Sequence, residues 1–332
     1  MSEPAVSVLL PVRDAAATLA ACLRSIARQT ETSFECVVAD DGSCDASLAI
    51  ARDRAARDPR FRVLELPATG LVATLNTGLT SCRGRYIARM DADDLMHRER
   101  LELQRAQLEA DPELAGVGCH VRVFPRAGLS DGMRAYEAWL TSLASPEDVA
   151  RDVFIECPLA HPTWLVRRRV FEALPYRDRG WPEDQDWILR AHRRGLRLGV
   201  VPRRLVSWRR GGLSDHDPRY AIERFVACKA HHLARSFLPD HPHYVLWGYG
   251  GTGRALRRAL AREGRLPSHI VELHPGRLGQ TIHGAPVIEP SGLAGLDGPI
   301  VVSVAGAGPR GQIRQALATL GRVEGEDFVC AA

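Results

Sequence analysis

The sequence contains no apolar run near the roughly 18 residues that a membrane-spanning helix requires. Ser2 and Glu3 at its start are unlike a secretory signal. The eight cysteines are scattered and none forms a CxxC pair, so neither a zinc site nor a disulfide framework is indicated. Lys229 is the only lysine, and a net charge of +4 gives no indication of nucleic-acid binding. We therefore expect a cytoplasmic protein with reduced thiols.

The composition is that of an ordinary globular protein, with 45% hydrophobic and 25% charged residues. The 332 residues are enough for two domains. Strand and helix signals alternate through the first 95 residues, with strands at 5–12, 34–39, 61–66 and 85–90 and helices at 15–29, 45–57 and 71–79. This alternation predicts an α/β fold with a parallel sheet that has helices on both faces.

The remainder divides into two parts. Residues 97–236 are helix-rich with few clear strands, and we expect helices at 97–110, 184–194 and 220–236 and short strands at 197–201 and 205–208. A new unit follows, with strands at 244–247, 270–273 and 300–304 and helices at 254–263 and 310–320. We predict one domain at 1–236, a linker at 237–242 and a second domain at 243–332.

Acidic residues follow two of the predicted strands. Asp91 and Asp93 lie one residue apart, so both carboxylates can share a hard divalent cation that in turn holds phosphate oxygens, although a solvated turn is the simpler alternative for this pair alone. Asp40 and Asp41 end another strand, where a turn that caps the next helix is the simpler alternative. Ligands of parallel sheets bind beyond the carboxyl ends of the strands. Two such motifs in one sheet therefore indicate a ligand site.

These motifs occur within a longer pattern: VSVLLPVR at 6–13, SIARQT at 25–30, DDGS at 40–43, GLVATLNTGL at 70–79 and GRYIARMDADD at 84–94. In this order and spacing the pattern resembles family 2 glycosyltransferases of the GT-A fold. The resemblance implies a GT-A nucleotide-diphospho-sugar transferase domain. It also implies a nucleotide-sugar donor (a UDP-sugar), a divalent metal (Mn²⁺ or Mg²⁺) and inversion at the anomeric carbon. The C-terminal unit separately looks like a smaller Rossmann-like α/β domain.

Carried over to this sequence, the resemblance assigns the donor site. Asp41 accepts a hydrogen bond from the nucleobase, with Pro11 and Arg13 lining the same pocket, and Asn76 also belongs to this site. Asp93 is the main metal ligand.

Asp91 supports the ribose or the waters of the metal. The segment WRRGGLS at 208–214 resembles a loop that closes over the donor pyrophosphate, where many relatives have a histidine. Arg209 and Arg210 stand there instead, so we expect them to clamp phosphate rather than to supply a third metal ligand.

The segment WPEDQDWILR at 181–190 resembles the acidic motif that opens a helix beneath the acceptor. Asp184 matches the catalytic base, with Glu183 as its neighbour, although acids that complement a helix dipole are the simpler alternative. The QxxRW motif of processive synthases is absent, which favours transfer of a single sugar. His161 and Trp187 are acceptor-site candidates, and for His161 a packed loop histidine is the alternative.

The stretch from Trp187 to Ser214 contains eight arginines and no acid. A solvated basic face and contact with a phosphate-bearing acceptor or an anionic membrane surface both remain open. The acceptor itself is a hydroxyl of a glycan, a lipid-linked sugar or a small molecule, and homo-oligomerisation is open as well.

In the C-terminal unit, Gly248, Gly250 and Gly253 form GxGxxG between a strand and a helix, and Glu272 follows at the end of the next strand. These are the positions of a pyrophosphate turn and a ribose-binding acid, which makes a second nucleotide site a candidate. Packing, dimerisation or regulation are the alternatives. Two rival functions follow: a nicotinamide-dependent sugar oxidoreductase, for which no Tyr/Lys pair is visible, and a non-catalytic nucleotide-sugar-binding protein.

Overall fold

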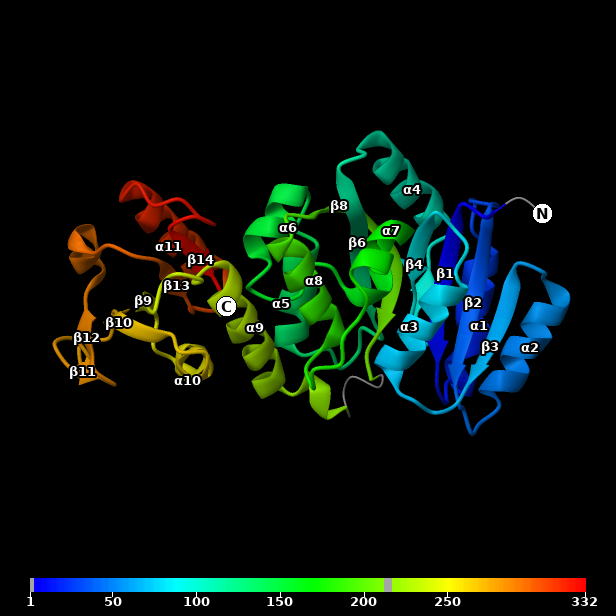
Figure 1. Cartoon of the computed structure of the whole chain (residues 1–332), viewed down its shortest axis with the longest axis horizontal. Helices are drawn as coiled ribbons and strands as arrows, with labels where there is room; N and C mark the ends of the chain where they lie inside the picture. Colours follow the sequence, from blue (N-terminus) through cyan, green and yellow to red (C-terminus); the bar gives the residue numbers. More distant parts are fainter. Residues whose placement is uncertain (1–2, 212–216) are drawn as a thin grey trace. The chain divides into compact units, whose positions relative to one another are not determined.

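The computed structural model describes residues 3–211 and 217–332, which form two compact units (Figure 1). Residues 3–150, 158–179 and 194–211 make the first unit, and residues 151–157, 180–193 and 217–332 make the second. Residues 180–193 and 217–236 thus group with the C-terminal strands, while the domain boundary at 237–242 stays a prediction. Leu213 and Ser214 of the expected phosphate loop lie outside the described residues.

Among its described residues the first unit has an eight-stranded sheet in the order β3-β2-β1-β4-β7-β6-β8-β5. The four strands β3, β2, β1 and β4 pair in parallel. They are β1 (Val6–Val12), β2 (Phe34–Asp41), β3 (Phe61–Leu66) and β4 (Tyr86–Arg89), joined through α1 (Ala16–Ala27), α2 (Ser47–Arg57) and α3 (Leu71–Ser81). The α/β alternation predicted for the first 95 residues is confirmed.

Every residue of β1 is buried, because helices cover both faces of the sheet at this strand. Val8 and Leu10 belong to the core that includes Leu19 and Leu23 of α1. On the other face α3 comes so close that a Cβ on Gly78 would collide with the side chain of Leu9. The sheet is therefore buried on both sides, and its carboxyl edge is left to the turns that carry the acids.

The rest of the first unit contains more strand than the sequence led us to expect. Its elements are β5 (Leu95–Met96), α4 (Arg100–Ala110), β6 (Leu114–Phe124), α5 (Asp131–Leu140), a 3₁₀ turn (His161–Thr163), β7 (Leu165–Arg167), α7 (Arg168–Ala173) and β8 (Arg197–Arg209), while α6 (Pro146–Asp152) crosses into the second unit. The two short strands predicted at 197–201 and 205–208 are one strand, β8. Its pairing with β6 shifts register between Val201 and Arg204, and this irregularity caused the apparent break.

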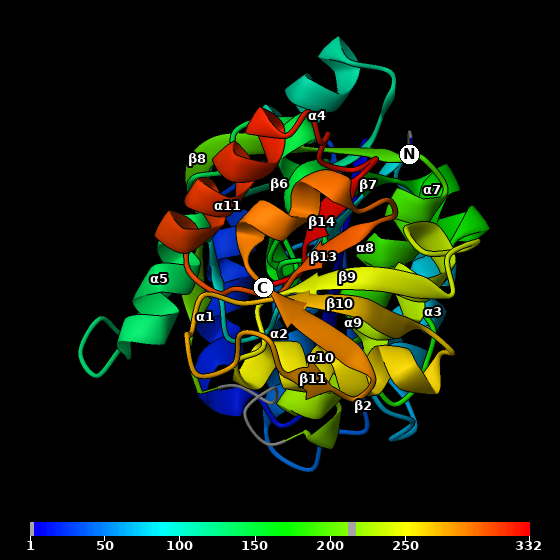
Figure 2. The ribbon, with the colours of Figure 1, turned by 90° about the vertical axis from the view of Figure 1, so that its left-hand side faces the viewer.

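The second unit contains α8 (Glu183–Arg193) and α9 (Ile222–Ser236), with a 3₁₀ turn (Pro218–Tyr220) between them. A six-stranded sheet follows among its described residues, in the order β11-β12-β10-β9-β13-β14, and Figure 2 shows β14, β13, β9 and β10 in succession. The elements are β9 (His243–Trp247), α10 (Gly251–Arg262), β10 (Leu266–Val271), β11 (Thr281–Ile282), β12 (Ala285–Ile288), a 3₁₀ helix (Pro290–Gly295), β13 (Ile300–Val302), α11 (Ala307–Thr319) and β14 (Phe328–Cys330).

The five parallel strands of this sheet lie in the chain order 3-2-1-4-5 that characterises Rossmann folds. The expected Rossmann-like α/β unit is thereby confirmed. Lys229 of α9 connects the first and the last segment of the second unit, since Nζ donates to the carbonyl oxygens of Ile155 at 2.8 Å and of Ala331 at 2.6 Å. Burial lowers the pKa of this lysine to about 8.

Candidate active site

Three carboxylates cluster directly after β4. One oxygen each of Asp91, Asp93 and Asp94 lies within 4.8 Å of the others. Burial, and then the charge of Asp91, raise the pKa of Asp93 to about 6. The side chain of Asp94 is fully buried, and among the described residues its Oδ2 atom accepts no hydrogen bond. Crowded acids with an unused buried oxygen form a donor set that suits a hard divalent cation.

Arg209 comes to this cluster from 115 residues further along the chain. Its backbone N–H donates to Asp94 Oδ1 at 2.6 Å, and its Nε donates to the Asp93 carbonyl at 2.9 Å. The guanidinium also lies 4.4 Å from the ring centre of Phe124. Arg210, directly after β8, is exposed, and its N–H donates to the Phe124 carbonyl. The predicted phosphate clamp and the predicted acidic motif therefore lie together.

Asp41, at the end of β2, links the two loops beside it. Its Oδ1 accepts from the N–H groups of Thr69 at 2.7 Å and Gly70 at 3.1 Å, and Arg13 donates to Oδ2 at 3.3 Å. Gly42 has φ +67, and a Cβ there would lie 2.8 Å from Ala68 N, so only glycine fits this turn. Pro11 is buried in β1. Asp41, Pro11 and Arg13 thus share one edge of the sheet, and their contact with a nucleobase stays a prediction.

Asn76 and His161 both hold the segment around Tyr176. The Asn76 amide donates to the Tyr176 carbonyl and accepts from its N–H, each at 3.1 Å. His161 is 6% exposed, shares a 2.8 Å hydrogen bond with the Tyr176 hydroxyl and packs with its ring centre 4.6 Å from that of Trp164. This geometry favours the packing alternative for His161. The ligand-binding roles of both residues stay predictions.

The acidic motif of the second unit forms the first turn of α8, and its acids differ in access. Glu183 is fully buried, and the Tyr220 hydroxyl lies 2.9 Å from each of its carboxylate oxygens. Asp184 is only partly buried. Trp187 is 1% exposed and is a core side chain here, so its contact with an acceptor stays a prediction. Among the acids of this turn, Asp184 is therefore the one that solvent reaches.

Asp186 anchors the same turn. It lies 2.6 Å from Arg190 Nε and 3.0 Å from His232 Nε2, and it accepts from Trp181 Nε1 at 3.2 Å. Burial alone would raise the pKa of Asp186, but the hydrogen bond to His232 and the charge and hydrogen bond of Arg190 outweigh burial, so its pKa is lowered. The carboxylate stays charged and fixes α8 against α9.

The glycine motif of the second unit lies at the carboxyl end of β9. Gly248 has φ +97, and a Cβ on Gly253 would collide with the Gly248 carbonyl, whereas a Cβ on Gly250 would meet nothing within 4 Å. Glu272 follows β10 and pairs with Arg277 at 2.6 Å. The chain order of the strands reverses between β9 and β13, where open α/β sheets bind ligands. A second nucleotide site here stays a prediction.

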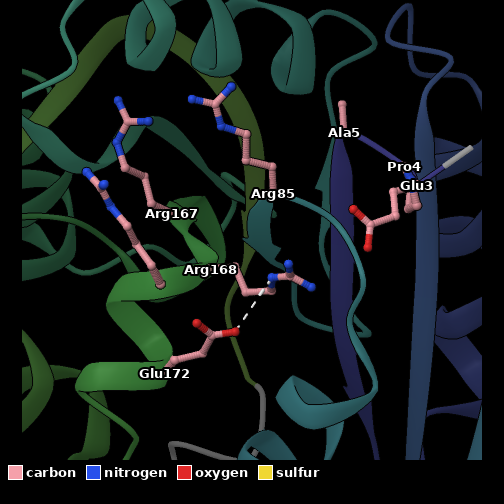
Figure 3. Close-up of a pocket in the computed structure, with 8 residues that line it drawn as sticks. Glu3, Pro4, Ala5, Arg85, Arg167, Arg168 and Glu172 are labelled. Atoms are coloured by element: carbon pink, nitrogen blue, oxygen red, sulfur yellow. Dashed lines mark ion pairs between the residues drawn. The ribbon is translucent and has the colours of Figure 1, made fainter.

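A cavity of about 440 Å³ lies near the amino end of β1, away from the acids of the carboxyl edge. Figure 3 shows Arg168 paired with Glu172, while Arg85 and Arg167 extend away from this pair. Arg167 is already engaged, since its guanidinium donates to the Leu114 and Leu108 carbonyls at 2.7 and 2.6 Å. These arginines do not converge on one point, so the cavity is not a candidate for the active site.

Sequence reasoning missed two residues of these sites. Asp94 adds the third carboxylate of the cluster. Its position next to Asp93 was a signal in the sequence, but only Asp91 and Asp93 were considered as metal ligands. Tyr220 holds Glu183 across 37 residues, for which the sequence offers no local signal. Asp94 closes the motif at 84–94 but was assigned no role, whereas Tyr220 lies outside the motifs that carry the resemblance.

Comparison with known proteins agrees with these features. EpsH of Bacillus subtilis (strain 168), described as "Putative glycosyltransferase EpsH", is 31% identical over 201 residues, which are 58% of this chain and 57% of EpsH. Chondroitin synthase of Escherichia coli is 33% identical over 125 residues, 38% of this chain and 18% of that protein. The chain thus matches well under two thirds of either relative.

Among solved structures, S. aureus TarS 1-349 in complex with UDP-GlcNAc has a TM-score of 0.56 at 18% identity, over 78% of this chain and 72% of that one. This likeness supports the GT-A fold. No helix in the described ranges is both long and apolar enough to cross a membrane. The family model "Glycosyl transferase family 2" matches residues 7–174, from β1 through the acidic cluster to α7. With this match over half of its length, the chain belongs to glycosyl transferase family 2.

Proposed function

We propose that the chain is an inverting, metal-dependent glycosyltransferase that moves one sugar from a UDP-sugar to a hydroxyl acceptor in glycan or polysaccharide biosynthesis. The observation that carries this proposal is the cluster of Asp91, Asp93 and Asp94 with Arg209 bonded to it. The relationship to chondroitin synthase and the likeness to a UDP-GlcNAc complex support the class of product and of donor.

The donor's diphosphate would lie against this cluster. Asp93 and Asp91 would hold Mn²⁺ or Mg²⁺, whose bound charge stabilises the departing diphosphate. The carboxylate oxygens and the unused Asp94 Oδ2 fit such an ion. Arg209 and the exposed Arg210 would bind phosphate oxygens, for which the planar guanidinium fork is suited.

Asp184 would act as general base. A carboxylate oxygen of Asp184 takes the proton from the acceptor hydroxyl while the hydroxyl oxygen of the acceptor attacks the anomeric carbon. The new C–O bond forms on the face opposite the breaking bond to the diphosphate, and the configuration inverts. The partial exposure of Asp184 supports this assignment over Glu183, which is buried and held by Tyr220.

The matched pair Asp184→Asn and Glu183→Gln tests this assignment. Thermal-shift screening of nucleotide-sugars with Mn²⁺ first identifies the donor, because a ligand that binds only the folded state raises its stability. Asp184→Asn should keep donor affinity nearly intact and lower the transfer rate by roughly a hundredfold or more. If Glu183→Gln lowers the transfer rate severely and Asp184→Asn only slightly, at equal donor affinity, Glu183 and not Asp184 is the general base.

A further inference from the structure

A second cavity, of about 320 Å³, lies in the first unit between α5 and the strands β6 and β8. Its volume is at the lower end of the range for ligand pockets, roughly 300–1,000 Å³. Its lining is strongly basic and includes Arg122, Arg126, Arg134 and Arg204, together with Glu137 and Thr141. We call this cavity the arginine pocket.

Most of the positive charge in the arginine pocket is uncompensated. Glu137 is buried, and it pairs with Arg126 while it also accepts from the Val123 N–H at 3.2 Å. Within residues 3–211 and 217–332, no ion pair or side-chain hydrogen bond engages the other three arginines. Four guanidinium groups and one carboxylate leave a net charge of +3 around one small cavity. An anion would relieve the repulsion between these groups, and phosphate matches the arginine fork best.

The arginine pocket lies close to the acidic cluster along the sheet. Leu95, the residue after Asp94, pairs with Ser207 of β8, and Ser207 pairs with Arg122 of β6. Two strand spacings of about 4.8 Å therefore separate the backbones of Leu95 and Arg122, about 10 Å in all. One extended ligand can reach across this distance.

We infer that the arginine pocket binds a phosphate group of the acceptor, so that the acceptor is a phosphate-bearing saccharide. The inference rests on the proposed transferase function. The donor's own diphosphate is assigned to Asp93 and Arg209, which leaves this second anion site to the other substrate. A concave cavity of 320 Å³ favours a discrete phosphate group over the flat surface of a membrane.

The test measures binding without any transfer reaction. Full-length protein in EDTA is titrated by calorimetry at low salt with glucose 1-phosphate, and with glucose as the uncharged control. We expect the sugar phosphate to bind and glucose not to bind. The variant R122Q/R134Q/R204Q should raise the Kd for glucose 1-phosphate at least tenfold, with a melting curve that shows it folded.

A matched variant, R24Q/R28Q/R262Q, removes the same charge from exposed arginines outside both sites and should leave the Kd within twofold. Equal weakening by both triple variants, or no binding by the natural protein, would overturn the inference. The inference would also be overturned if glucose 1-phosphate does not bind, while the protein sediments with phosphatidylglycerol vesicles and only R122Q/R134Q/R204Q abolishes this sedimentation. The arginines would then bind a membrane surface.

The inference and the proposed function fail in different ways. If no nucleotide-sugar supports transfer or shifts the melting temperature, the proposed function is wrong, whatever the arginine pocket binds. If transfer is found but proceeds equally well in R122Q/R134Q/R204Q and the natural protein at low acceptor concentration, only the acceptor assignment is wrong.

Discussion

Asp186→Asn removes one charge from a buried ion pair while it keeps the shape of the side chain. Asp186 and Arg190 are each 3% exposed and lie 2.6 Å apart. The substitution removes the charge that Asp186 places against the buried Arg190 guanidinium, and loss of one partner of such a pair costs about 3–5 kcal/mol. We therefore expect Asp186→Asn to lower the free energy of unfolding of the second unit by this amount.

The chain offers a control of the same geometry on the surface. Asp53 and Arg57 are also four residues apart on a helix and 2.7 Å apart, but their side chains are 57% and 73% exposed. Asp53→Asn should change stability by no more than about 0.5 kcal/mol. The two pairs differ in burial and in the further contacts of Asp186 with His232 and Trp181, so the comparison measures what the buried surroundings add to the pair.

Urea unfolding followed by tryptophan fluorescence measures both variants, with Trp181 and Trp187 as reporters beside the buried pair. Because the pKa of Asp186 is lowered on folding, its contribution is complete above the pKa of the unfolded chain and is lost as the pH falls through the folded value. The natural protein and Asp186→Asn should accordingly converge in stability in acid. Equal costs for Asp186→Asn and Asp53→Asn at neutral pH would refute the reasoning.

Three further predictions concern the other sites. Asp93→Ala should abolish transfer because the leaving diphosphate loses its charge compensation, and full activity in EDTA would contradict this. Gly253→Ala should cost about 2 kcal/mol or more because its Cβ collides with Gly248. Gly250→Ala, with φ −73 and open space, should change stability by less than about 1 kcal/mol, because the lower entropy of the unfolded chain is offset by the preference of this N-cap position for glycine; denaturation of both variants checks this. Lys229 binds its proton less readily in the folded than in the unfolded chain. The free energy of unfolding of the natural protein, relative to that of Lys229→Met, should therefore rise by up to about 3 kcal/mol from pH 8 to 10.5. A difference between the two proteins that does not change with pH would contradict this.

The first four strands could be predicted because their signals are local: short apolar runs that end in turn-forming acids, with helices between them. Strand β6 could not. Its sequence contains Gly116 and Gly118, which weaken a strand pattern. The structure explains both, because a Cβ on Gly116 would press against Val166 of β7 and one on Gly118 against Leu159. Residues that argue against a strand locally are there because another part of the chain packs onto it.

The candidate site divides in the same way. Asp41, Asp91 and Asp93 could be identified because strand ends in one parallel sheet share an edge. That Arg209 meets Asp93 and Asp94 depends on the pairing of β5 with β8 across more than a hundred residues, which only the family resemblance could suggest. The arginine pocket is formed by residues of β6, β8 and α5, and α5 was not predicted. The clustering of its arginines could therefore not be inferred from their positions in the sequence.

The single lysine makes the protein unusually simple for amine chemistry. Reagents that acylate or cross-link lysine side chains find only Lys229, which is 9% exposed and holds the carbonyls of Ile155 and Ala331. Modification there requires the segments that cover α9 to open first. The rate at which Lys229 is acylated, followed by mass spectrometry, therefore reports the local opening of the second unit. No reporter residue has to be engineered into the chain for this measurement.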